Sequence, residues 1–345
     1  MTTLPELPGT LPLPDLQFPI PSMVHPGADR IEEQLARWAT DLHLLSDEPA
    51  ARRFARAQFG RFAAYTYPHA ADLELVAGWN ALMWFIDDVI DEQPQQDGDE
   101  TMLDLAHDLL AQMPTDLKAP RPTHPLACAM ADLWSRTAPS QSLHWRTRNT
   151  GHYRTALACG LQAHDHSARA KERAADLPAY IRRRREHSGT QLSLDLLELG
   201  HEVPPIIADS RLSLAIQLLA ADVTGWTNDL WSLRKEHSNA DSANLVIVLY
   251  LARGGTWEQA LATATTMTED AIRDFFTACD DLRRARPLYG VGESEWECLE
   301  GYLTGIAEWL AGMVRWHAET GRYWDTAPVP WGPPGGPRID RLPTS

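Results

Sequence analysis

The stretch from Asp72 to Glu92 reads DLELVAGWNALMWFIDDVIDE and carries apolar side chains on nearly every face of a helix. Such a helix is expected to be buried, yet its last turns hold Asp87, Asp88 and Asp91. Several buried carboxylates are costly unless something neutralises them. Divalent cations would do so, because Mg²⁺ prefers carboxylate oxygens and keeps positions open for phosphate oxygens. The alternative is a helix end that emerges into water, although acids at a carboxyl end oppose the helix dipole.

The rest of the chain repeats this helical spacing of apolar residues, and clean two-residue alternation is rare, so we predict an all-α fold. We find no internal repeat and no linker that would divide the chain. The expected helices cover residues 29–46, 48–66, 71–92, 101–113, 125–137, 143–164, 178–199, 209–237, 241–252, 256–284 and 293–323.

Both ends of the chain are rich in proline, which removes a backbone donor and blocks the preceding helical turn. We therefore expect extended or disordered tails at 1–26 and, rich in proline and glycine, at 326–345. The residues between them, 27–325, are predicted to form one domain.

The composition narrows the possible partners and the compartment. Of 345 residues, 44% are hydrophobic and 23% are charged, which is ordinary for a globular protein. The net charge of −16 disfavours nucleic acid and anionic membranes as partners. No bilayer-spanning run and no signal peptide are visible, and four scattered cysteines indicate neither a zinc site nor a disulfide framework. These features predict a cytoplasmic protein.

A second polar cluster lies between Asn228 and Glu236, which reads NDLWSLRKE. Asn228, Ser232 and Glu236 are four residues apart and share one helix face. Their amide, hydroxyl and carboxylate oxygens are hard ligands suited to Mg²⁺. Lys235 lies beside this face, where it can bind an anion. Polar triplets of this kind often lie on a solvated surface. The prediction of a Mg²⁺ site here therefore depends on the acidic cluster found on another helix.

The two clusters together resemble known metal motifs. Residues 87–92 resemble the aspartate-rich motif of class I terpene synthases, and NDLWSLRKE is similar to their second motif, in which Asn, Ser and Glu bind Mg²⁺. Arg322 and Tyr323 match the C-terminal Arg-Tyr pair of the bacterial single-domain type. The likeness covers the chain from about Pro19 to Tyr323.

A further element of the resemblance is YIRRRREHSG, residues 180–189. In the family a Tyr precedes an Arg pair, of which the first senses diphosphate, and a helix break follows near a Gly. Counting from Tyr180 selects Arg184, with Arg185 beside it, whereas counting back from the second metal motif favours Arg182. We choose Arg184, and the alternative is that the four arginines form an exposed basic face.

The resemblance implies a helical bundle around a deep central pocket, three Mg²⁺ ions, an isoprenoid diphosphate substrate and closure when the substrate binds. Diphosphate leaves only when its charge is neutralised. The implied metal ligands are Asp87, Asp88, Asp91, Asn228, Ser232 and Glu236, and the implied diphosphate contacts are Arg184, Lys235, Arg322 and Tyr323.

Departure of diphosphate leaves an allylic cation that needs a dry, unreactive pocket. Aromatic faces stabilise cations without reacting, and the chain contains 13 tryptophans. Trp84 lies one turn before Asp87, and Trp309 and Trp316 lie seven residues apart near the end of the last helix. We predict that these three line the pocket; the alternative is that they are ordinary core residues.

The predicted function is therefore a Mg²⁺-dependent terpene cyclase acting on farnesyl diphosphate (C15), with geranylgeranyl diphosphate (C20) as the alternative. A chain-elongating prenyltransferase would carry a second aspartate-rich motif in place of NDLWSLRKE. An all-α pyrophosphohydrolase has no use for a tryptophan-lined pocket. A non-catalytic helical binding protein would not need either metal motif. The sequence leaves the oligomeric state open, and the resemblance implies a homodimer as one common form in the family.

Overall fold

The computed structural model describes residues 5–8, 11, 16–45, 47–92, 98–166, 176–238 and 243–320, and none of these residues forms a strand. The predicted all-α class is confirmed. The helices are α1 (Ala28–Asp41), α2 (Glu48–Ala57), α3 (Phe59–Thr66), α4 (Leu73–Glu92), α5 (Gly98–Ala111), α6 (Pro125–Thr137), η1 (Ala138–Ser140), α7 (Leu143–His166), α8 (Leu177–His187), α9 (Thr190–Asp195), η3 (Leu196–Glu198), α10 (Pro205–Ala208), α11 (Arg211–Ser238), α12 (Leu245–Arg253), α13 (Trp257–Arg284), α14 (Arg286–Tyr289) and α15 (Glu293–Glu319).

The helix expected over 48–66 is interrupted at Gln58, whose φ of 54° is left-handed. Side chains at the carboxyl end of α15 contact the carbonyl groups at this break. Thr320 Oγ1 donates to the carbonyl of Ala57 at 3.0 Å, and Trp316 Nε1 donates at 3.1 Å to that of Gln58, which also accepts from the amide of Phe62. Contacts with α15 therefore stabilise a break that no glycine or proline marks.

The helix expected over 178–199 is also divided, between α8 and α9. Gly189 begins α9 with a φ of 64°, a conformation that costs glycine little. The hydroxyl of Ser188 accepts a hydrogen bond from the amide of Thr190. The family resemblance implies a helix break at this glycine, and the structure has one there.

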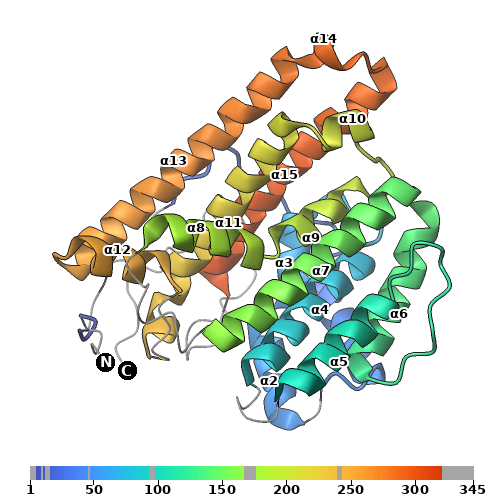
Figure 1. Ribbon diagram of the computed structural model, residues 1–345, viewed down its shortest axis with the longest axis horizontal. Helices are drawn as coiled ribbons and strands as arrows, with labels where there is room; N and C mark the ends of the chain where they lie inside the picture. Colours follow the sequence, from blue (N-terminus) through green and yellow to red (C-terminus); the bar gives the residue numbers. More distant parts are fainter. Residues whose placement is uncertain are drawn as a thin grey trace.

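Seven helical segments form a closed ring (Figure 1). α4 packs against α3, α3 against α15, and α15 against α11. On the other side α11 packs against α8 and α9, which contact α7, and α7 returns to α4. Outside this ring, α13 covers α11, while α1, α5 and α6 cover α3, α4 and α7. Residues far apart in the sequence are thus brought to the same end of the ring.

The described part of the predicted N-terminal tail contains no helix, in agreement with its prolines, but it packs on the bundle. Leu11 is only 5% exposed, and the ring of Phe18 lies 5.8 Å from that of Phe276 on α13. Arg234 Nη2 on α11 donates to the carbonyl of Pro8 at 3.1 Å. The predicted C-terminal tail, 326–345, lies outside the described residues.

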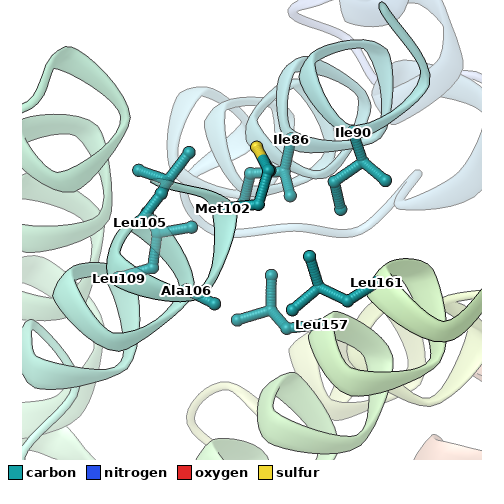
Figure 2. Close-up of a pocket in the computed structure, with 8 residues that line it drawn as sticks. All are labelled: Ile86, Ile90, Met102, Leu105, Ala106, Leu109, Leu157 and Leu161. Atoms are coloured by element: carbon teal, nitrogen blue, oxygen red, sulfur yellow. The ribbon is translucent and has the colours of Figure 1, made fainter. Parts of the chain in front are cut away.

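The carboxyl-terminal half of α4 has one strongly apolar face (Figure 2). Ile86 and Ile90 project from α4 into a small cavity shared with α5 and α7. Every side chain that lines it is apolar: Ile86, Ile90, Met102, Leu105, Ala106, Leu109, Leu157 and Leu161. This face anchors the helix in the core and leaves its acidic residues on other faces.

Among the described helices, none is both long and apolar enough to span a membrane.

Candidate active site

The acidic end of α4 is only partly buried. Asp87 is half-buried and Asp88 is exposed, whereas the side chain of Asp91 lies outside what the structure describes. Ile86 and Ile90, on the neighbouring face, are buried. The helix therefore leaves the core within the motif, which is the alternative to buried carboxylates that the sequence left open, and Asp87 and Asp88 are accessible to water, ions and ligands.

The three predicted ligands on α11 are largely screened from water. Ser232 is 2% exposed, and its Oγ is buried with no hydrogen-bond partner in the described structure. Glu236 Oε2 accepts a hydrogen bond from Asn244 Nδ2 at 2.8 Å, and Asn228 Oδ1 accepts one from Arg184 Nη2 at 2.8 Å. A buried hydroxyl without a partner beside an amide and a carboxylate oxygen suits a hard divalent cation.

Of the four arginines at 182–185, all within the described residues, Arg184 contacts the motif. Its Nε donates to Asp229 Oδ1 at 3.0 Å, and a Cβ at Gly225 would lie 2.9 Å from its Cγ, so only glycine leaves room for it. Arg182 and Arg183 are exposed. Arg185 forms a two-bond ion pair with Asp222, at 2.7 and 2.6 Å.

Asp229 is a residue of the motif whose role the sequence reasoning missed. It is 0% exposed and accepts hydrogen bonds from Tyr180 Oη, Arg184 Nε and, at 2.8 Å, the amide of Leu245. Although burial by itself lowers the pKa of an arginine, the Asp229 carboxylate outweighs it and holds the pKa of Arg184 above its usual value. Asp229 thus ties α8 and α12 to α11. The sequence did contain a signal for this role, because Asp229 is an acidic residue on a face of α11 away from that of Asn228.

His317 on α15 was also missed. It is 4% exposed, with Nδ1 2.9 Å from the carbonyl of Met313 and Nε2 3.3 Å from Asn228 Nδ2. Nothing in the sequence near His317 indicates this contact, because Asn228 lies 89 residues earlier in the chain. It connects α15 to the second motif.

The three predicted pocket tryptophans meet at one phenylalanine. Phe62 on α3 contacts Trp84, Trp309 and Trp316 edge-on, with ring centroids 4.8, 5.9 and 5.2 Å away. Trp84 also stacks on Phe59 at 4.1 Å. Trp309 and Trp316 are almost fully buried, whereas Trp84 is half-buried. The sequence reasoning did not identify Phe59 and Phe62, which complete this aromatic cluster.

The aromatic cluster links the two motifs at one end of the helix ring. Trp84 lies one turn before Asp87 on α4, and Trp316 lies beside His317, which contacts Asn228. Lys235 is exposed next to Glu236. Arg322 and Tyr323 lie outside the described residues. Among those described, no group of three or more His, Cys, Asp or Glu is arranged to hold a metal, so a metal on α11 needs Asn and Ser oxygens.

The profile of the protein family described as "Terpene synthase family 2, C-terminal metal binding" matches residues 78–274, more than half of the chain. The chain belongs to this family. The matched segment includes both the aspartate-rich motif and the Asn-Ser-Glu motif, and it confirms the class I terpene synthase predicted from them.

Curated terpene synthases match over nearly the whole chain. Pentalenene synthase of Streptomyces arenae is 27% identical, with 90% of this chain and 92% of the relative covered. The 7-epi-alpha-eudesmol synthase of Streptomyces viridochromogenes is 26% identical, with 90% and 91% covered. The enzyme is therefore a terpene synthase, a lyase that acts on carbon–oxygen bonds.

Solved terpene synthases have the same all-α fold. The crystal structure of a-eudesmol synthase is similar with a TM-score of 0.79 and 25% identity, covering 87% of this chain and 97% of that one. Germacradien-4-ol synthase from Streptomyces citricolor is similar with a TM-score of 0.75 and 25% identity, covering 88% and 97%.

Proposed function

We propose that this terpene synthase ionises farnesyl diphosphate in a Mg²⁺-dependent reaction and cyclises the allylic cation to a sesquiterpene hydrocarbon or alcohol. The observation that carries the proposal is the aromatic cluster that joins the two motif-bearing helices, α4 and α11, through α15. This chemistry requires a polar rim for the diphosphate beside an aromatic wall for the hydrocarbon chain. One relative, 7-epi-alpha-eudesmol synthase, is described as cyclising (2E,6E)-farnesyl diphosphate.

The residues on α11 fit a divalent cation. The Ser232 hydroxyl has no protein partner in the described structure, and the Asn228 carbonyl oxygen faces a cation already, the guanidinium of Arg184. We assign Asn228, Ser232 and Glu236 to metal on this side and Asp87, Asp88 and Asp91 to metal on α4, with three Mg²⁺ ions in all. When bound, the metal neutralises charge on the leaving diphosphate.

Basic side chains complete the diphosphate site. Arg184 lies against the metal motif, where its guanidinium is paired with the carboxylate of Asp229. We assign it to the diphosphate together with Lys235, Arg322 and Tyr323. A guanidinium presents several donors in a fixed plane and binds phosphate oxygens in pairs.

The aromatic cluster provides the opposite wall. Trp84 is half-buried beside Asp87, and Trp316 and Trp309 extend the wall inward through Phe62. Their π faces stabilise positive charge without supplying a nucleophile, and they exclude water that would quench the cation. The central pocket, its tryptophan lining, the homodimer and the cytoplasmic location stay predictions. The curated relatives do not favour the alternative substrate, geranylgeranyl diphosphate, and family membership does not favour a non-catalytic binding protein.

Parallel incubations with geranyl, farnesyl and geranylgeranyl diphosphate test this function, each with and without Mg²⁺ and analysed by gas chromatography and mass spectrometry. We expect a cyclic C15 product from farnesyl diphosphate that requires Mg²⁺. A cyclic product from geranylgeranyl diphosphate alone would replace the substrate assignment. Release of diphosphate without any cyclic product would contradict the cyclase.

A further inference from the structure

The two nitrogens of His317 have contacts that specify one tautomer. Nδ1 lies 2.9 Å from the carbonyl oxygen of Met313, which only accepts hydrogen bonds, so Nδ1 carries the proton. Nε2 then has a lone pair and accepts a hydrogen bond from the Asn228 amide nitrogen at 3.3 Å. The other tautomer would place the lone pair of Nδ1 against the carbonyl oxygen of Met313. It would also place the N–H of Nε2 against the amide N–H of Asn228. Both contacts therefore select the Nδ1-protonated ring.

This tautomer decides which end of the Asn228 amide faces which neighbour. A flipped amide would direct its carbonyl oxygen at the Nε2 lone pair, which is repulsive. The oxygen is therefore directed away from His317, and there it accepts a hydrogen bond from Arg184 Nη2 at 2.8 Å. A cationic group therefore contacts the same amide oxygen that we assign to the metal.

We propose that His317 is the positioning residue of the second metal motif: it holds the Asn228 amide so that its carbonyl oxygen faces the metal and diphosphate. Ligands of metals are commonly oriented by a hydrogen bond from a neighbouring side chain, and here a histidine orients an amide. The inference rests on the proposed function, because it takes Asn228 as a metal ligand.

The surroundings of His317 allow it to act in this way. The ring is 4% exposed and packs edge-on against Trp316, with centroids 5.0 Å apart. Met313, whose carbonyl accepts the hydrogen bond from Nδ1, lies one turn earlier on the same helix. A ring held by both the helix backbone and the aromatic cluster cannot rotate freely, so its hydrogen bond restricts Asn228.

Replacement of His317 tests the role through metal affinity rather than turnover. His317→Phe keeps the size and packing of the ring but removes the acceptor, whereas His317→Gln offers an amide oxygen at a similar position. Mg²⁺ and inorganic diphosphate together should raise the melting temperature of the protein. The readout is the Mg²⁺ concentration that gives half of this rise, measured with diphosphate present. We expect His317→Phe to raise this Mg²⁺ concentration about 10- to 100-fold, and His317→Gln to bring it most of the way back to the native value.

Met313→Leu is the matched control, because it changes a buried side chain on α15 but leaves the backbone carbonyl in place; we expect native Mg²⁺ affinity. An unchanged Mg²⁺ requirement in His317→Phe, or equal losses in the Phe and Gln variants, would overturn the inference. If His317→Phe does not fold, the wild-type protein decides: long-range ¹⁵N–¹H spectra should show His317 protonated at Nδ1, and protonation at Nε2 would refute it.

Asn228→Ala separates failure of this inference from failure of the proposed function. If Asn228→Ala binds Mg²⁺ and diphosphate as the native protein does, the metal assignment itself is wrong. If Asn228→Ala loses affinity while His317→Phe does not, only the positioning role of His317 is wrong.

Discussion

The indole ring of Trp84 stacks on that of Trp316, with centroids 5.6 Å apart and planes inclined by 28°. The contact joins α4, one turn from the aspartate-rich motif, to α15, next to the histidine that contacts Asn228. Because the two motifs lie on different helices, this aromatic contact helps to set their separation.

Removal of a proposed metal ligand should abolish most turnover without unfolding the protein. We expect Asn228→Ala and Glu236→Ala each to lower kcat/KM by about two to three orders of magnitude, because the developing charge on diphosphate loses a fixed counter-charge. Steady-state kinetics with farnesyl diphosphate, and circular dichroism for the fold, measure the two effects. Glu33→Gln on the surface of α1 is the control. Native turnover in Asn228→Ala would exclude it as a ligand.

The neighbouring residue, Asp229, should act on stability instead. Asp229→Ala leaves the buried guanidinium of Arg184 without its carboxylate, and we expect a loss of about 3–5 kcal/mol in the free energy of unfolding. Tyr180→Phe removes one hydrogen bond to the same carboxylate and should cost about 1 kcal/mol. Urea denaturation without Mg²⁺ measures both, with the exposed Asp281→Ala as control. Equal losses for Asp229→Ala and Asp281→Ala would contradict the anchoring role.

Replacement of Trp316 should alter the products more than the release of diphosphate. Trp316→Leu removes the ring that stacks on Trp84 and packs against Phe62, so the cation should fold along other paths. Product profiles by gas chromatography and a diphosphate-release assay compare the two effects. Trp134→Phe, which perturbs a tryptophan between α6 and α7, should leave the profile unchanged. An unchanged profile in Trp316→Leu would identify Trp316 as a core residue.

A buried cluster outside the proposed site should make stability depend on pH. Burial raises the pKa of Glu198 to about 7, against the opposing effect of Arg148. Burial lowers the pKa of His152, but the Asp195 carboxylate, 2.8 Å from its Nδ1, outweighs this and raises it above 6.5. Tyr302 also faces the cluster.

Both groups bind protons more tightly in the folded state, so unfolding releases protons in this range and stability falls as pH rises. The contribution of Glu198 is complete below pH 4.5 and is lost as the pH approaches about 7. That of His152 is present below pH 6.5 and is lost above its folded pKa. Urea denaturation between pH 5 and 8 should show this fall, and Glu198→Gln should make it shallower. Identical slopes in the two proteins would contradict this assignment.

The sequence predicted what depends on spacing along a single helix. The side chains of Asn228, Ser232 and Glu236 share a face because a helix repeats every 3.6 residues, whatever surrounds it. The same rule indicated the apolar faces of α4 and the bounds of α6, which the structure confirms at 125–137. It also identified Trp84 and Trp316 as candidates, although not the contact between them.

Features that depend on distant contacts needed the tertiary structure. The break at Gln58 has no local signal, since it is stabilised by Trp316, which lies 258 residues later. Counting along the chain selected Arg184, with Arg182 as the alternative, but the contact of Arg184 with the second motif depends on the space that Gly225 leaves and on the buried Asp229.

By itself the sequence therefore determined the helical class and, through the resemblance of its two motifs, the enzyme family, because periodicity and motif order are properties of the chain. Only the tertiary structure showed that Arg184 contacts the second motif, that Phe62 contacts the three tryptophans, and that His317 contacts Asn228. Hydrogen bonds and ring contacts depend on distances of a few ångströms between helices, and the packing of the whole bundle sets those distances.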